Sequence, residues 1–418
     1  MIDPDDRHDP QQAPTLARSI EAIRAEFPGL AAGTVALDGA AGTLVPEPVI
    51  TAVSGALRDA MANTHGAFAA SQSSTETQAA AREAIADLVG GTPGGVILGS
   101  NMTTLTFLLA DALAAGWKPG DEVIVTSLDH DANIRPWVLA AQRAGATVRW
   151  AEFDVATGEL EPEAFDALLS ERTRLVAVTA ASKAIGTRPD LAAITARAHA
   201  AGALTYVDGV HATPHAGTDV ATLGADFYAC SSYKFFGPHA GAVIADPAQL
   251  DAIHPAKLLP APDGVPERFE RGTPAFELLA GVSAAVDWIA GLTATRGDRR
   301  ARLLAAMGAA EGHLAMLLER ALQGLSAIDG VRLLGSAARR TSTISFVVSG
   351  HAPEAVAREL AAQGIAVWHG DNYARELMTR FGLEQSGGAI RASLVLYNDA
   401  ADVDRLVEAV ATLAQSGG

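Results

Sequence analysis

Short apolar runs alternate with segments of helical periodicity over most of the chain. The runs have the length of buried strands and occur at 96–100, 122–126, 147–153, 174–180, 204–209, 226–232 and 241–246. Segments with helical spacing of apolar residues separate them, at 78–91, 104–116, 135–144, 161–170 and 189–201. Strands that alternate with helices predict an α/β fold, with a mostly parallel sheet covered by helices on both faces.

The pattern changes after residue 270. Residues 275–325 are almost entirely helical in periodicity, and strands at 331–335, 342–348 and 390–397 then accompany helices at 353–364 and 401–415. This order predicts a smaller α+β domain on an antiparallel sheet. We therefore divide the chain into a large domain at 27–290 and a small C-terminal domain at 291–418. Residues 1–26 are a poorly ordered tail followed by a segment that joins the small domain.

Composition narrows the classes of function. The 418 residues carry 31 basic and 48 acidic side chains, a formal net charge of −17, which disfavours nucleic acid and anionic membranes as partners. The single cysteine, Cys230, excludes an internal disulfide framework, and we expect no metal site. The N-terminus lacks the apolar stretch of a signal peptide, and no uninterrupted apolar run is long enough to span a membrane. We expect a cytoplasmic protein.

The segment at 205–239 is the richest in candidate chemistry. Asp208 ends an apolar strand, where open α/β sheets bind ligands, and Lys234 follows the next strand among aromatic and small residues. Poor solvation lowers the pKa of such a lysine and makes its amine more nucleophilic. Each residue alone is consistent with an ordinary loop. Together they indicate a pyridoxal phosphate site, in which Lys234 forms the Schiff base and Asp208 keeps the pyridine nitrogen protonated.

Six ordered blocks carry a resemblance to a known family. The chain resembles the class V aminotransferase group of fold-type I pyridoxal phosphate enzymes, and most of all its cysteine-desulfurase-like branch. The blocks are FPGLAAGTVALDGAAGTLVP from residue 27, VILGSNMTTLTF, DEVIVTSLDHDANIRPW, the 205–239 segment, FERGTPAFE and AIRASLVLYND. The resemblance implies a seven-stranded type of large sheet and a homodimer with shared active sites, acting on a small amino acid.

The resemblance also assigns cofactor-binding positions. It places the loop before a helix, with Asn101, Met102 and Thr103, at the cofactor phosphate, where helix N-terminal amides favour anions. His130 matches the imidazole stacked on the cofactor ring, and His211 stands where many relatives have glutamine near the phenolic oxygen. The remaining matches are to phosphate-binding side chains: Ser231, Tyr233 (often histidine in relatives) and Thr273, whose counterpart reaches the neighbouring subunit's phosphate.

The substrate positions include one match and several departures. Arg391 matches the residue that grips the α-carboxylate, a task suited to a two-pronged guanidinium. Lys183 replaces the usual asparagine, and is either a solvent-facing loop residue or a second cation for an extra carboxylate. We also assign His65 and His369 to the substrate site.

The segment WHGDNYA at 368–374 is the most consequential departure. Cysteine desulfurases have an Arg-Thr-Gly-His-His-Cys-Ala type of motif here, and Tyr373 stands in place of its nucleophilic cysteine. A phenol cannot accept sulfur as a persulfide, and Cys230 has the sequence context of a small buried hydrophobe. Persulfide-forming desulfurization is therefore not expected.

Several functions remain open on the sequence alone. Our first choice is a lyase that β-eliminates a C–S bond from a cysteine-like substrate, because this reaction needs no loop cysteine. The alternatives are a class V aminotransferase or epimerase, a decarboxylating or aldol-type enzyme for a dicarboxylic amino acid, and an inactive binding protein of this fold.

Overall fold

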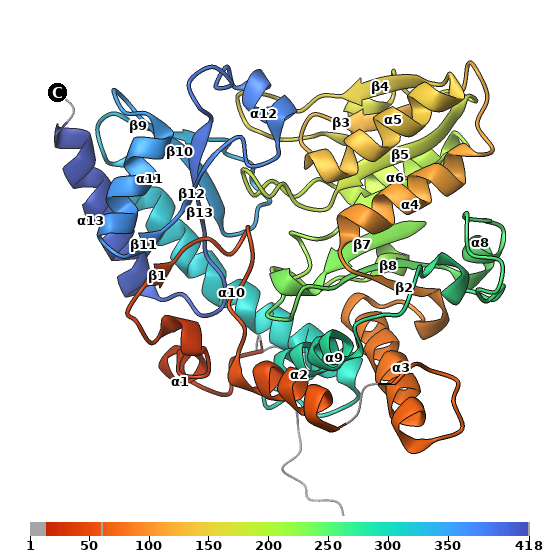
Figure 1. Cartoon of the computed structure of the whole chain (residues 1–418). Coiled ribbons are helices and arrows are strands. Elements are labelled where there is room, and N and C mark those ends of the chain that lie inside the picture. The colour runs from red at the N-terminus through yellow and green to blue at the C-terminus, as the bar shows by residue number, and fades with distance from the viewer. Residues whose placement is uncertain (1–13, 60–61, 417–418) are drawn as a thin grey trace, which may run out of the picture.

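The structure is a computed structural model and describes residues 14–59 and 62–416. A large sheet of seven strands dominates one half of the molecule and a smaller sheet the other half (Figure 1). The first thirteen residues of the expected tail lie outside the described residues. The predicted α/β class and the seven-stranded sheet are confirmed.

The large sheet has the order β2-β8-β7-β6-β5-β3-β4. The strands β7, β6, β5, β3 and β4 are parallel to one another, and β8 runs antiparallel to both β7 and β2. Their bounds are β2 (Val96–Gly99), β3 (Glu122–Thr126), β4 (Thr147–Ala151), β5 (Thr173–Thr179), β6 (Leu204–Asp208), β7 (Phe227–Ser231) and β8 (Gly241–Ala245).

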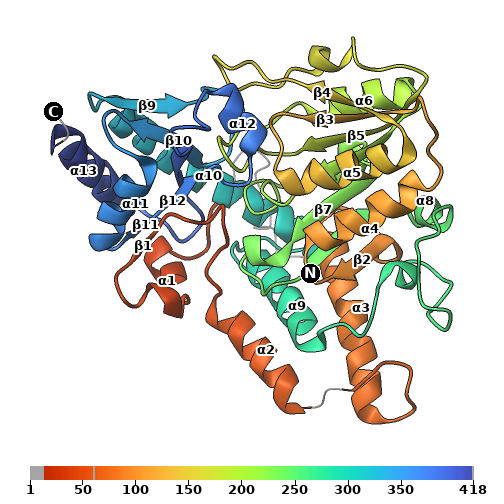
Figure 2. The same ribbon diagram turned by 45° about the horizontal axis from the view of Figure 1, so that its top comes forward.

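Helices bury both faces of this sheet, which explains why its strands read as continuous apolar runs. On β3, Ile124 packs into one hydrophobic cluster while Val123 and Val125 pack into the other. The first face is covered by α3 (Ala69–Val89), α6 (Leu191–Ala200) and α9 (Phe276–Ala290), and the second by α4 (Met102–Ala114) and α5 (Arg135–Ala144). Figure 2 shows α4 and α5 together on their side of the sheet.

The small sheet is antiparallel, with the order β12-β13-β10-β9, as predicted for the C-terminal part. Its strands are β9 (Val331–Leu334), β10 (Thr343–Val348), β12 (Trp368–Gly370) and β13 (Ala389–Ser393). The helices α10 (Arg299–Ser326), α11 (Pro353–Ala362) and α13 (Ala400–Ser416) share a hydrophobic core with it.

The N-terminal segment that joins the C-terminal part extends beyond residue 26, where it was predicted to end. The short strand β1 (Val35–Ala36) pairs in parallel with β11 (Ile365–Ala366), and Asp38 forms a bridge with Ser393. Residues 35–38, which we had assigned to the large domain, thus pair with the C-terminal part. The remaining helices are α1 (Ile20–Arg24), α2 (Glu47–Asp59), α7 (Val220–Leu223), α8 (Pro247–Asp251) and α12 (Arg375–Arg380).

Two helical segments differ from simple expectations. The helix predicted at 161–170 is wrong, because only the 3₁₀ turn Pro162–Phe165 forms. Beyond it, the backbone amide of Ser170 bonds Thr173 Oγ1 at 2.9 Å, which turns the chain into β5. By length and composition α10 could cross a membrane. In this fold, however, it packs against α9 and α13 and contributes buried side chains such as Leu303 and Leu317 to the core.

Candidate active site

A cavity of about 640 Å³ lies where the carboxyl ends of the large parallel strands face the small sheet. The ends of β5, β6 and β7 supply one wall, and β12, its following loop and β13 supply another. This is where open α/β sheets bind ligands. The cavity brings together most of the predicted site residues: Met102, Thr103, His130, Lys183, Asp208, His211, Ser231, Tyr233, Lys234, His369, Tyr373 and Arg391.

Lys234 ends a 3₁₀ turn that follows β7 directly. Its side chain is 5% exposed, and Nζ donates a hydrogen bond to the carbonyl oxygen of Ala40. Nζ also lies 5.1 Å from the centroid of the Tyr233 ring. Burial and the nearby Arg391 cation lower the pKa of the Lys234 amine to about 7. A large part of the amine is therefore unprotonated and nucleophilic near neutral pH.

Asp208 is the last residue of β6 and is almost completely buried. One carboxylate oxygen accepts a hydrogen bond of 2.9 Å from the amide of Val210. Burial raises the pKa of Asp208 to about 6, although Lys183 and Lys234 oppose that rise. A carboxylate in this position can hold a protonated ring nitrogen, because the two opposite charges compensate each other's desolvation.

His130 stands in the turn after β3 and is positioned by its neighbours. Its Nδ1 accepts a hydrogen bond of 2.8 Å from the amide of Ala132, which leaves the ring proton on Nε2. Burial, helped by the nearby cations, holds the pKa of His130 well below its ordinary value. The ring is thus neutral, as suits a group that stacks on an aromatic cofactor.

Sequence reasoning missed Asp129, which precedes His130. Its carboxylate is fully buried and accepts hydrogen bonds from Asn133 Nδ2 at 2.7 Å, from the amide of Thr179 at 3.1 Å and from the Thr126 hydroxyl. These bonds tie the end of β3 to the end of β5. Burial raises the pKa of Asp129 to about 8. Its position next to His130, in the loop at the end of a strand, is the sequence feature that could have identified Asp129.

The N-terminus of α4 opens onto the cavity. Asn101 is the N-cap of this helix, its Oδ1 accepting a bond of 2.9 Å from the amide of Thr104, while Met102 and Thr103 line the cavity. The amide of Met102 donates to Ser231 Oγ at 3.3 Å. A Cβ atom on Gly241 of β8 would sit 2.3 Å from the backbone carbon of Asn101. Only glycine at 241 therefore lets this anion-binding loop lie against the sheet.

Arg391 lies on β13 with 2% of its surface exposed. Its Nη1 donates to the carbonyl oxygen of Lys183 at 3.3 Å, and its buried Nε has no hydrogen-bond partner among the described residues. Burial lowers the pKa of Arg391 to about 10, and Asp38, which sequence reasoning also missed, opposes that change. A buried guanidinium with an unpartnered Nε on a cavity wall has the chemistry to bind a carboxylate.

Lys183 turns into the cavity and not to solvent. Its Nζ lies 5.3 Å from the centroid of the Tyr373 ring, and burial together with Arg391 and Lys234 holds its pKa well below the ordinary value. Lys183 thus lines the cavity, and its predicted role as a second cation for a substrate carboxylate stays a prediction.

The 368–374 segment forms the rim facing His130. β12 is antiparallel to β13, so Trp368 is paired with Arg391, and the loop that follows has left-handed backbone at Asn372 and Tyr373. The Tyr373 side chain is 70% exposed and its ring stacks on His130. Its carbonyl oxygen accepts a bond of 2.8 Å from the amide of Asp131.

His211 is buried at the boundary of the two sheets. Its Nε2 lies 2.9 Å from Thr343 Oγ1 and 3.2 Å from Thr341 Oγ1, and burial holds its pKa well below the ordinary value. The neighbouring His215, which sequence reasoning did not single out, packs edge-on against it with ring centroids 4.7 Å apart. Both imidazoles are therefore neutral, and they join the large sheet to β10.

Three predicted site residues lie outside the lining of this cavity. Asn101 acts behind it as the helix cap, so its assignment to the cofactor is indirect. His65 is exposed in the turn before α3 and does not line this cavity, and its assignment to the substrate site stays a prediction. Thr273 is exposed beside a second cavity next to α4, and its predicted contact with a neighbouring subunit's phosphate stays a prediction.

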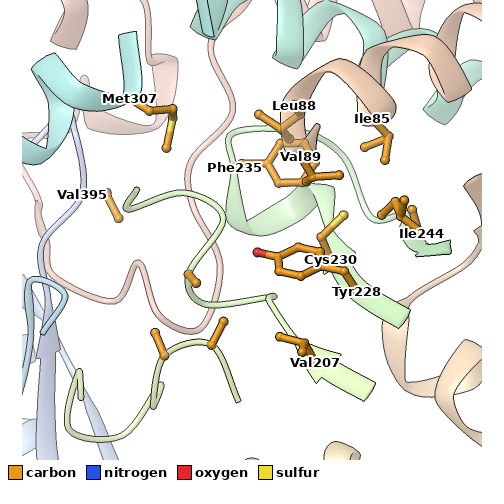
Figure 3. Close-up of a cluster of buried hydrophobic side chains, with 14 of the residues drawn as sticks. Ile85, Leu88, Val89, Val207, Tyr228, Cys230, Phe235, Ile244, Met307 and Val395 are labelled. Atoms are coloured by element: carbon orange, nitrogen blue, oxygen red, sulfur yellow. The ribbon is translucent and has the colours of Figure 1, made fainter. Parts of the chain in front are cut away.

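Cys230 is fully buried within β7, as expected. Its side chain packs among Ile85, Tyr228 and Ile244 on the face of the sheet covered by α3 (Figure 3), and burial raises the pKa of its thiol to about 12. It does not line the cavity. The only thiol of the chain therefore cannot serve as a nucleophile at this site.

The donor set fits pyridoxal phosphate. The cavity offers a nucleophilic amine at Lys234, a buried carboxylate at Asp208, a neutral ring at His130 and the amides of a helix N-terminus for the phosphate. In the described part of the chain, no three His, Cys, Asp or Glu side chains are grouped to hold a metal ion. Fold and site together define an enzyme of the pyridoxal-phosphate-dependent type.

Comparison with known proteins gives the family. Residues 35–406 match the family described as Aminotransferase class-V, and the chain belongs to this family. An uncharacterized protein from Mycobacterium tuberculosis is 38% identical over 400 residues, which are 95% of this chain and 100% of that protein.

Solved structures extend the similarity to the whole fold. The cysteine desulfurase CsdA from Escherichia coli is 30% identical, with a TM-score of 0.83 that covers 96% of this chain and 99% of CsdA. A cystine C–S lyase, solved with its product cysteine persulfide, has the same fold, with a TM-score of 0.77 at 23% identity over 92% of this chain and 99% of the lyase. The chain is thus a pyridoxal-phosphate-dependent enzyme related to cysteine desulfurases.

Proposed function

We propose that this enzyme β-eliminates the sulfur substituent of a cysteine-like amino acid, releasing a thiol, pyruvate and ammonia. The observation that carries the proposal is the arrangement around His130. The Tyr373 phenol stacks on His130, and the family resemblance implies that Tyr373 stands at the loop position of the desulfurase nucleophile, while the only thiol of the chain, Cys230, is buried in the core. The remaining groups supply what an elimination needs, which is a carboxylate receptor and a proton carrier.

Residues of the cavity would hold the cofactor. Asp208 would face its pyridine nitrogen, His130 its ring, and the N-terminus of α4 with Ser231 its phosphate, as the family resemblance also implies. Thr103, Tyr233 and His211 complete this set. Bound pyridoxal phosphate would accept the electron pair that is left at Cα when its proton departs.

The chain's own residues would then carry out the proton movements. Arg391 would bind the α-carboxylate and so fix the orientation of the Cα–H bond. Lys234, as a free amine, would take the Cα proton. The Cβ–S bond would break with its electron pair on sulfur, and the thiolate would leave as a thiol after taking up a proton. Addition of one water to the three-carbon remainder would release pyruvate and ammonia, which balances the reaction.

The relatives support this outcome in part. The C–S lyase of the same fold acts on cystine, which shows that the architecture can carry C–S bond cleavage. CsdA, which is more similar, is a cysteine desulfurase. Because no thiol of this chain reaches the cavity, the sulfur would leave with the substrate fragment and would not be transferred to the protein.

Product analysis tests the proposal. Purified enzyme loaded with pyridoxal phosphate is mixed with S-alkyl-L-cysteines, and pyruvate, ammonia and thiol are measured with no keto acid added. We expect the three products in equal amounts and none from Lys234→Ala, while Lys257→Ala, outside the cavity, behaves like the wild type. Turnover that requires a keto acid would establish transamination instead, and sulfur bound to the protein would contradict the proposal.

We also propose that the enzyme is a homodimer in which Thr273 reaches the partner subunit's cofactor phosphate. Thr273 is exposed and lies away from the cavity of its own chain. Light scattering should give twice the 43.0 kDa chain mass. Thr273→Ala should weaken cofactor binding without changing that mass, and a monomer that binds the cofactor with full affinity would contradict the dimer.

A further inference from the structure

Lys183 forms no ion pair with the carboxylates of the cavity, although Asp208 and Asp371 attract it at a distance. Of the cavity's other basic groups, Arg135 pairs with Asp131 at 3.2 Å, and Lys234 and Arg391 have the tasks proposed above. Nζ of Lys183 has no ion-pair or hydrogen-bond partner in the described part of the chain, and its contact there is with the Tyr373 ring. The charged form of this partly buried amine is poorly stabilised by the protein alone, which points to a ligand that supplies a negative charge beside it.

The direction of the Lys183 side chain indicates which part of a substrate it would meet. Its backbone carbonyl is held by Arg391 at 3.3 Å, which places the residue beside the α-carboxylate receptor. Its amine lies 5.3 Å from the centroid of the Tyr373 ring, and the family resemblance implies that Tyr373 stands at the loop position of the sulfur-accepting residue of desulfurases. The amine therefore lies on the side of the cavity that faces the substituent at Cβ.

The other charged group on this side is already engaged. Asp371 is exposed, and its Oδ1 accepts a hydrogen bond of 2.9 Å from the amide of Tyr373. It is attracted to Lys183 only at a distance, without an ion pair. Two partly exposed aromatic side chains, Phe107 and Trp368, also line the cavity. The subsite thus combines one cation with apolar walls.

We propose that the preferred substrates are cysteine S-conjugates whose sulfur substituent ends in a carboxylate, with Arg391 binding the α-carboxylate and Lys183 the distal one. This inference rests on the proposed elimination. It adds a specificity-determining role for Lys183 to a site whose chemistry is set by Lys234 and Asp208. The distal carboxylate must lie close to the sulfur atom. Nη1 of Arg391 bonds the backbone carbonyl of Lys183, so only the length of the Lys183 side chain separates the two carboxylate-binding groups.

A matched pair of substrates tests the inference. S-carboxymethyl-L-cysteine and S-carbamoylmethyl-L-cysteine have nearly the same shape and differ by one negative charge. The wild-type holoenzyme should favour the carboxylate about tenfold or more in kcat/KM, the size expected for a charge-assisted bond in a buried site. In Lys183→Met the ratio should fall to about one, in Lys183→Arg it should recover in part, and in the control Lys257→Met it should stay as in the wild type.

Binding measurements separate this inference from the proposed reaction. The dissociation constants of the two conjugates are read from the change in cofactor absorbance, whether or not products form. Tighter binding of the carboxylate, lost in Lys183→Met, with no pyruvate released would support the subsite and contradict elimination. Pyruvate formed from both conjugates at equal kcat/KM and equal affinity would overturn the subsite and leave elimination standing.

Discussion

The phenol ring of Tyr373 lies on the imidazole of His130, with ring centroids 5.5 Å apart and planes 12° from parallel. The two residues are far apart in sequence and belong to different sheets' loops. Their contact covers the side of the cavity where a sulfur-accepting thiol would have to move. With Nζ of Lys183 5.3 Å from the centroid of the phenol ring, the two rings and this amine form one side of the cavity.

Removing this wall should change substrate affinity more than stability. Tyr373 is 70% exposed, so Tyr373→Ala should alter the free energy of unfolding by no more than about 0.5 kcal/mol. The KM for a cysteine S-conjugate should rise several-fold, because an aromatic wall of the substrate site is lost, while Tyr373→Phe keeps the stacking and a wild-type KM. Thermal unfolding and steady-state kinetics measure the two effects. An unchanged KM in Tyr373→Ala would place the substrate elsewhere.

The pKa of Lys234 predicts how cofactor loading depends on pH. Only the unprotonated amine can bond to the aldehyde, and its pKa is lowered to about 7. The rate at which apoenzyme takes up pyridoxal phosphate should therefore rise about tenfold per pH unit below 7 and level off near pH 8. Stopped-flow absorbance measures this rate. A rate that still climbs toward pH 10 would show an ordinary, solvated lysine.

The buried carboxylate of Asp208 should lower the free energy of unfolding of the apoenzyme at neutral and higher pH. Burial raises its pKa from 3.8 to about 6, so folding takes up protons there, and the charged form opposes folding above that range. The apoenzyme variant Asp208→Asn should therefore be more stable than the wild type at pH 8, by about 1–3 kcal/mol. The difference should vanish as the pH falls below about 4.

Chemical denaturation at pH 8 and pH 4 measures this effect, and Asp226→Asn, which is remote from the cavity, serves as a variant for comparison. Asp208→Asn should at the same time bind the cofactor poorly. If Asp208→Asn were less stable than the wild type at pH 8, the Asp208 carboxylate would be stabilised by a cation already in the apoenzyme, which would contradict this prediction.

Gly241 controls the position of the phosphate-binding loop. A methyl group there would collide with the backbone of Asn101, so Gly241→Ala should displace the N-terminus of α4 and weaken cofactor binding about tenfold or more. Gly312→Ala, in α10 with open space around its Cβ position, should leave the affinity unchanged and stabilise the fold slightly. Fluorescence titration of both apoenzymes compares them. Equal affinities would remove the loop from the phosphate site.

The thiol of Cys230 should be chemically silent in the folded enzyme. It is fully buried and its pKa is raised to about 12, so a thiol reagent should react only after denaturation. Cys230→Ala should keep wild-type turnover, since no step proposed above uses sulfur of the protein. Loss of turnover in a variant that is folded by circular dichroism would contradict the assignment.

The sequence was most informative where one local signal decides the structure. Apolar runs such as 122–126 are buried on both faces of the sheet, and their period and length alone predict strands. Asp208 and Lys234 could be singled out because Asp208 ends one such run and Lys234 comes shortly after the next. The predicted helix at 161–170 failed because the contacts of Ser170, and not helical periodicity, decide the conformation there.

Other site residues depend on contacts that local sequence does not encode. Asp38, Asp129 and His215 look like ordinary polar positions, and only the pairing of distant segments buries the last two and partly buries Asp38. His65 and Lys183 were equally ambiguous, and the fold leaves the first exposed and turns the second inward. Burial of a polar side chain is a property of the tertiary structure.

The bond between Arg391 and position 183 uses the main chain of residue 183, so it does not depend on which side chain that residue carries. Replacement of residue 183 can therefore exchange the distal part of the substrate while the grip on the amino acid's constant end persists. An enzyme built this way can acquire new substrates through single substitutions without first losing its old chemistry. Position 183 is accordingly where laboratory evolution of this enzyme should begin.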